Sequence, residues 1–108
     1  MGGEVYLINL NKIMKTGQTK YIATAGADKV ITAQRAFLHR IIIGKDVSNA
    51  IVEISDHASD GDGDVQIYLS GSTLSGVYEI GTEFNKGICA DLTLQTNVTF
   101  VFENRGAN

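Results

Sequence analysis

Nine residues, DHASDGDGD from Asp56 to Asp64, hold four aspartates and one histidine. Oxygen ligands of this kind suit Ca²⁺, and Asp60, Asp62 and Asp64 alternate like the first three ligands of an EF-hand loop. An EF-hand loop also needs Gly at its sixth position and Glu at its twelfth, where this chain has Val and Gly. The EF-hand match therefore fails.

Two interpretations of the acidic stretch remain open. In the first, Asp60, Asp62 and Asp64 hold a Ca²⁺ ion, weakly because all three ligands come from one loop. In the second, the stretch is an exposed hairpin tip with hydrated carboxylates, because Asp-Gly pairs are typical of tight hairpin turns. A Ca²⁺-binding nonapeptide repeat is excluded, since the motif occurs only once.

Residues for nucleophilic catalysis are present, but their spacing is unsuitable. Ser55, Asp56 and His57 are consecutive, and consecutive strand residues point to opposite faces. No G-x-S-x-G, H-E-x-x-H or phosphate-binding glycine loop occurs. His39 and Cys89 stand apart from any partner in the sequence, and Cys89 lies in an apolar run typical of a buried thiol. We therefore expect no catalytic residues, no enzyme activity and no cofactor other than the Ca²⁺ considered above.

The elements that would position these residues have the pattern of β-strands. Alternating or continuous apolar runs cover Phe37–Ile43, Ala50–Ser55, Val65–Leu69, Ile88–Leu94 and Val98–Glu103. Polar turn signals separate them at Gly44–Asn49, Asp60–Gly63, Gly71–Gly76 and Thr96–Asn97. This spacing predicts an all-β fold. We expect a single antiparallel, jelly-roll-like β-sandwich of about eight strands with an extended N-terminal segment.

Alternation also predicts which side chains point into the core. Phe37–Ile43 is apolar on both faces near its end, which indicates a central strand. The other runs place one set on the inner face: Ala50, Val52, Ile54, Val65, Ile67, Leu69, Ile88, Ala90, Leu92, Leu94, Val98, Phe100 and Phe102.

The N-terminal third has a different composition. Residues 1–36 are rich in Thr, Ala, Gly and Lys, and we interpret them as edge strands or an extended arm, with Glu4–Leu10 a possible strand. Residues 37–108 form the predicted core of the one domain. The chain has no proline, a common blocker of sheet edges, so its edges are guarded otherwise or pair with a neighbouring subunit.

Composition and charge limit the classes of partner that we expect for this protein. The 108 residues carry a net charge of −3 with dispersed Lys and Arg, which argues against nucleic acid. No run is long enough to cross a membrane, and we expect no signal peptide. We therefore expect a protein made in a reducing cytosol.

The strand sequence resembles a known family. Leu38–Gly44 (LHRIIIG), Ala50–Asp56 (AIVEISD), Gly76–Ile88 (GVYEIGTEFNKGI) and Leu92–Glu103 (LTLQTNVTFVFE) follow one another as in small β-sandwich virion proteins of tailed bacteriophages, especially capsid decoration, or cement, proteins. The match covers residues 37 to 103 and is a pattern of strands. The DGDGD stretch and the N-terminal segment are not part of it.

The resemblance implies a structural role. Such a protein binds the major capsid protein on the outside of the head and stabilises the shell. It is located in the virion after assembly in the host cytoplasm, and it is a homo-oligomer for which a trimer would suit threefold positions. We place the attachment in Gly2–Gln34 by hypothesis. Alternatives are a tail, baseplate or head-fibre component, or a Ca²⁺- or carbohydrate-binding β-sandwich module.

Overall fold

The structure, a computed structural model, describes residues 18–59 and 64–106, and every regular element in them is a β-strand. In chain order the strands are β1 Gln18–Ile22, β2 Gly26–Thr32, β3 Ala36–Ile43, β4 Ala50–Asp56, β5 Asp64–Gly71, β6 Gly76–Phe84, β7 Ile88–Leu92 and β8 Val98–Asn104. No helix in this part of the chain is long and apolar enough to cross a membrane.

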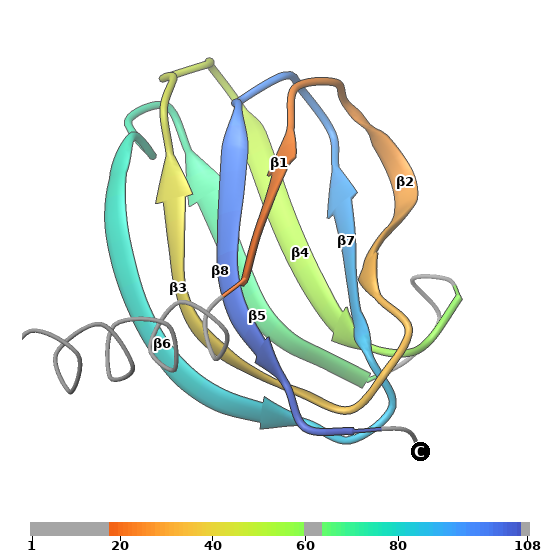
Figure 1. Ribbon diagram of the computed structural model, residues 1–108. Helices are drawn as coiled ribbons and strands as arrows, with labels where there is room; N and C mark the ends of the chain where they lie inside the picture. Colours follow the sequence, from red (N-terminus) through yellow and green to blue (C-terminus); the bar gives the residue numbers. More distant parts are fainter. Residues whose placement is uncertain (1–17, 60–63, 107–108) are drawn as a thin grey trace, which may run out of the picture.

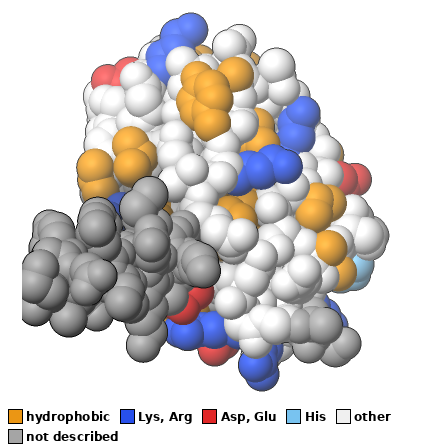
Figure 2. Space-filling model, viewed as in Figure 1, with side chains coloured by type: hydrophobic (Ala, Val, Ile, Leu, Met, Phe, Trp, Pro, Cys, Tyr) orange, Lys and Arg blue, Asp and Glu red, His pale blue; other side chains and the backbone are white. Residues whose placement is uncertain are grey.

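The strands form two four-stranded antiparallel sheets (Figure 1). Sheet A has the order β1-β8-β3-β6 and sheet B the order β2-β7-β4-β5. Sheet A lies toward the viewer in Figure 1 and in the space-filling view of Figure 2. Every connection between described strands crosses from one sheet to the other, except the β4–β5 hairpin. This is the double-sheet arrangement of a jelly roll, and the predicted all-β sandwich is confirmed.

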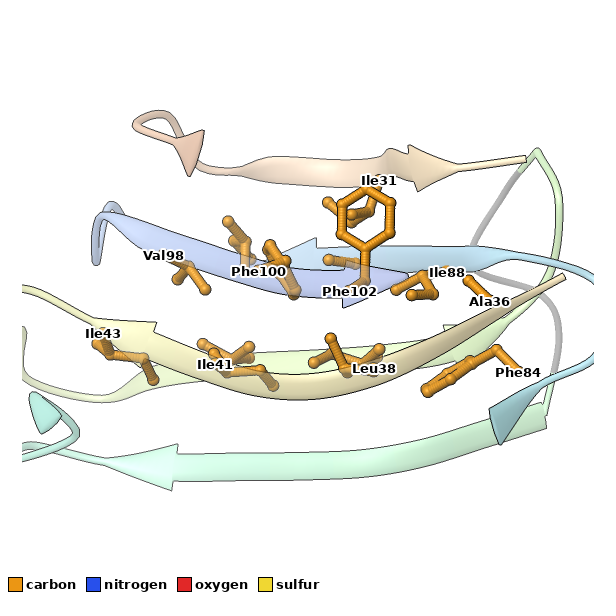
Figure 3. Packing of buried hydrophobic residues seen from close by; sticks show 14 of the residues in the cluster. Ile31, Ala36, Leu38, Ile41, Ile43, Phe84, Ile88, Val98, Phe100 and Phe102 are labelled. Atoms are coloured by element: carbon orange, nitrogen blue, oxygen red, sulfur yellow. The ribbon is translucent and has the colours of Figure 1, made fainter. Parts of the chain in front are cut away.

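The core is the layer of apolar side chains between the sheets. Leu38 and Ile41 of β3 and Phe100 of β8 meet there, all fully buried (Figure 3). Side chains of this size each stabilise the fold by about 1.5–3 kcal/mol when removed from water. Burial confirms most of the predicted inner set: Ala50, Val52, Ile54, Ile88, Ala90, Leu92, Val98, Phe100 and Phe102.

β3 is a central strand, as predicted, and it contains a bulge. The pairing of β3 with β8 passes from Leu38 directly to Arg40, so His39 is an extra residue. An extra residue also interrupts β6 opposite this point, where Gly81 has a φ of 62°. Because of the bulge, the buried positions of β3 pass from Leu38 to Ile41 instead of keeping a strict alternation.

Two predicted inner residues lie elsewhere. Val65 is exposed, because a bulge between β4 and β5 pairs Ile54 with Ile67 but Ser55 with Val65, which moves Val65 out of the inner register. Leu94 is also exposed, because β7 ends at Leu92. The prediction that these two side chains belong to the core was wrong.

β1 and β2 are outer strands of the sandwich. β1 pairs with β8 along one edge of sheet A, and β2 pairs with β7 along one edge of sheet B. Residues 1–17, including the predicted strand at Glu4–Leu10, lie outside the described residues. A deletion of Gly2–Gln34 would remove both β1 and β2. A loss of capsid binding in such a variant could therefore come from misfolding and would not locate the attachment in this segment.

The β3 bulge predicts different effects for two adjacent isoleucines. Ile41→Ala removes a fully buried side chain and should lower the free energy of unfolding by about 2–5 kcal/mol. Ile42→Ala, on the outer face, should cost less than about 1 kcal/mol. Urea denaturation followed by circular dichroism would measure both values, and equal losses would contradict the observed register.

Candidate functional site

The acidic stretch begins with a carboxylate that already has partners. Asp56, the last residue of β4, accepts backbone N–H groups of Asn85, Lys86 and Gly87 at 3.0, 2.8 and 3.4 Å. Asp56 therefore holds the turn between β6 and β7.

The described part of the structure does not show the three predicted Ca²⁺ ligands side by side. Asp64 is exposed at the start of β5, while Asp60 and Asp62 lie outside the described residues. Within residues 18–59 and 64–106, no three His, Cys, Asp or Glu side chains are grouped so that they could hold a metal ion. The Ca²⁺ site stays a prediction.

The other polar candidates occupy separate places. The ring Nδ1 of His57 accepts the backbone N–H of Ser59 at 3.1 Å. His39 lies on sheet A, with its Nε2 3.6 Å from a carboxylate oxygen of Glu103. Cys89 is a fully buried free thiol, as its apolar surroundings in the sequence indicated.

Two further aspartates join parts of the chain that are distant in sequence. Asp46 accepts the backbone N–H of Ser75 at 2.7 Å. Hydrogen bonds from the backbone and from the side chain of Ser75 lower the pKa of the Asp46 carboxyl. Asp91 accepts the N–H of Asp28 at 2.7 Å, and Asp28 has a φ of 57°. These carboxylates hold loops and an edge strand in place, so their role is structural.

The turn held by Asp56 depends on a glycine. Gly87 has a φ of +156°, and a Cβ there would lie 2.6 Å from the carbonyl oxygen of Thr32 and 2.7 Å from that of His57. Both obstacles are backbone atoms and cannot rotate away. The closely packed turn therefore excludes every residue with a side chain.

Gly87→Ala should consequently destabilise the protein by more than Gly76→Ala. Gly76 is a matched control, because its φ is +143° and a Cβ there would meet nothing within 4 Å. Backbone strain alone costs about 1–3 kcal/mol, and the clash at Gly87 should add to it. Thermal melting of both variants would measure the difference, and equal melting temperatures would refute the close packing.

The acidic stretch can be tested with added calcium. Ca²⁺ takes six to eight oxygen ligands, and Asp56 is already engaged by three N–H groups. We therefore expect the same melting temperature in millimolar Ca²⁺ and in chelator. A chelator-sensitive rise of several degrees that Asp62→Asn abolishes would establish the ion site instead.

The outer face of sheet A carries a row of aligned side chains across its four strands, hydrophobic on β1, β3 and β6 and a threonine on β8. The pairings align Tyr21 of β1, Thr99 of β8, Ile42 of β3 and Val77 of β6, here called the outer row. Tyr21 is 58% exposed and Val77 61%. Hydrophobic side chains stand out on this face, between Lys and Arg side chains (Figure 2).

Charged pairs border the outer row on its β3 and β6 side. Arg40 and Glu79 form an ion pair at 3.0 Å. Farther along the face, Arg105 contacts Glu103 at 3.2 Å and lies 5.1 Å from the ring centre of Phe37. Exposed pairs of this kind contribute about 0–1 kcal/mol to stability. They leave charges of both signs beside the apolar row.

The outer face of sheet B is different. Tyr68 is 56% exposed, but it aligns with the carboxylates Glu53 and Asp91 instead of apolar side chains. A hollow of about 470 Å³ lies beside Asp91 and is lined also by small residues such as Ala25 and Gly26. Tyr21 and Tyr68 lie on opposite sheets, so these two rings do not share one face.

Sequence reasoning did not identify the outer row. Tyr21 and Val77 are 56 positions apart in the sequence, and only strand order and register align them. The one signal was the apolar character of both faces of Phe37–Ile43, which placed an isoleucine on the outer face.

Comparison of the chain with protein-family models, curated proteins and solved structures found no match.

Proposed function

We propose that this chain is a capsid decoration protein of a tailed bacteriophage, which binds the major capsid protein on the outer surface of the head and stabilises the shell. The resemblance of residues 37 to 103 to such proteins supports the proposal, and its four segments overlap β3, β4, β6 and β8. A jelly roll is an architecture of viral capsid and lectin domains. Architecture alone does not decide function, so the proposal depends on the side chains at the surface.

The outer row is the observation that carries the proposal. It places Tyr21, Ile42 and Val77 on one sheet face, with paired charges beside them. Specific interfaces have this composition, with apolar and aromatic residues at the centre and a polar rim. Exposed tyrosines are frequent sources of binding energy, because a large ring loses little conformational entropy.

A small face is sufficient for this role. One sheet face of a chain this size supplies a modest contact area, so each contact is weak by itself. A shell offers many equivalent sites, and an oligomer that engages several of them gains affinity without new contacts. Binding to the assembled shell and not to free subunits stabilises the shell by mass action.

Replacing the tyrosine of the outer row should weaken head binding. We expect Tyr21→Ser to reduce the affinity for empty heads at least tenfold, since an aromatic side chain that dominates an interface contributes about 2 kcal/mol or more. Co-sedimentation of purified protein with heads would measure the affinity. Tyr68→Ser is the matched control, because Tyr68 is almost equally exposed but lies on sheet B.

Equal binding by the two variants would contradict the assignment of the outer row. Wild-type protein that binds purified tails or baseplates but not heads would replace the decoration role with the tail alternative. Binding to neither structure would overturn the proposal.

A further inference from the structure

The glutamates of the two sheets differ in their partners. Each glutamate of sheet A, namely Glu79, Glu83 and Glu103, has a carboxylate oxygen within 3.5 Å of an arginine nitrogen. The strands of sheet B contain one glutamate, Glu53 of β4, and its side chain is partly buried. The Glu53 carboxylate forms no hydrogen bond or ion pair with the residues that the structure describes. It is therefore a partly buried charge that the described fold does not neutralise.

The nearest aligned acid increases this negative charge. Glu53 pairs directly with Asp91 of β7, and like charges opposite each other destabilise an antiparallel pair. Asp91 accepts the N–H of Asp28, but within the described part of the chain it has no Lys or Arg partner. The one basic residue in the strands of sheet B is Lys29, whose Nζ donates to a hydroxyl in the β1–β2 connection at 3.2 Å. A cation beside Glu53 would relieve the repulsion.

An aromatic ring lies on the other side of Glu53. Tyr68 of β5 pairs with Glu53 and is 56% exposed. A hollow of about 310 Å³ adjoins Tyr68 and is lined also by Ile51, Asn49 and Ser70. Ile51 is two positions before Glu53 on β4, so both side chains point to the outer face of sheet B. The hollow thus has an apolar wall, two polar groups and a carboxylate at its border.

We propose that this hollow, here called the tyrosine hollow, binds an arginine side chain from an extended segment of a partner protein. The face of an aromatic ring attracts a cation, so the guanidinium lies on Tyr68 and donates to the Glu53 carboxylate. The apolar stem of the arginine packs on Ile51. Arginine fits better than lysine, because its planar head both stacks on a ring and donates two parallel hydrogen bonds to a carboxylate.

The position of β5 favours a polypeptide as the source of the arginine. β5 is the last strand of sheet B among the described residues, so an extended segment can pair with its free side. Neighbouring strands lie about 4.8 Å apart, so a residue added opposite Tyr68 would lie about 10 Å from Glu53. The long side chains of arginine and glutamate together span this distance, with the tyrosine ring between them.

The tyrosine hollow and the outer row lie on opposite faces of the sandwich. One molecule can therefore use both at the same time, and binding at the tyrosine hollow does not depend on the proposed binding of heads.

Isothermal titration calorimetry of the purified full-length protein with short peptides tests the proposal. The probe is an acetylated peptide of the sequence Thr-Val-Arg-Val-Thr. A matched peptide has citrulline, a neutral isostere, in place of arginine, and it should bind at least about tenfold more weakly because it cannot form the charged contact. Raising the salt concentration from about 0.05 to 0.5 M should weaken binding of the arginine peptide, because salt screens the attraction.

Two variants locate the binding site. Glu53→Gln and Tyr68→Ser should each reduce the affinity for the arginine peptide at least about tenfold. Glu79→Gln is the control for the charge, because it changes the net charge equally on sheet A. Tyr21→Ser is the control for the ring, because Tyr21 is 58% exposed on the opposite face. Both controls should keep the wild-type affinity, and circular dichroism would check that all four variants fold.

Wild-type protein that does not bind the arginine peptide would overturn the proposal, as would equal affinities for the arginine and citrulline peptides. Unchanged binding by Glu53→Gln would exclude the tyrosine hollow. Equal losses in Glu53→Gln and Glu79→Gln would show attraction to the net charge and would also overturn the assignment. Because no heads are used, these outcomes are independent of the head-binding test.

Discussion

The apolar layer between the sheets is the constraint on which the rest of the structure depends. Inward side chains of β3 and β8 must pack against those of β4 and β7, and none of these strands could hide its apolar face alone. The requirement decides the register of every strand, because a slip of one residue would exchange the inner and outer faces. The bulge at His39 shows that this packing requirement outweighs regular strand pairing. Strand β3 contains one extra residue there, and Leu38 and Ile41 both lie in the inner layer.

The ends of the sandwich are held by polar contacts. At one end, Asp46 accepts the N–H of Ser75, and the N–H of Gly44 donates to the carbonyl oxygen of Asn97 at 2.9 Å. At the other end, Asp56 accepts the N–H groups of the turn around Gly87. These bonds satisfy backbone groups that the ladders cannot reach, so Asp46 and Asp56 have structural roles.

The surfaces left over are the ones with functional potential. The same pairing that buries one face of sheet A aligns the outer row on its opposite face. Among residues 18–59 and 64–106, no further strand pairs with the last strand of either sheet. The proposed binding of heads uses the outer row and requires no reactive group.

The sequence by itself determined the fold class and much of the core. Alternation predicted the inner faces of β4, β7 and β8, and turn residues such as Asn97, with a φ of 56°, marked where strands end. These signals are local, because a strand needs a two-residue period and a turn needs a residue that tolerates positive φ. Only the tertiary structure decided the bulges, the exposure of Val65 and the engagement of Asp56, since each depends on a partner strand or turn distant in sequence. For the same reason the outer row could not be seen in the sequence, because it exists only once strand order and register bring distant residues side by side.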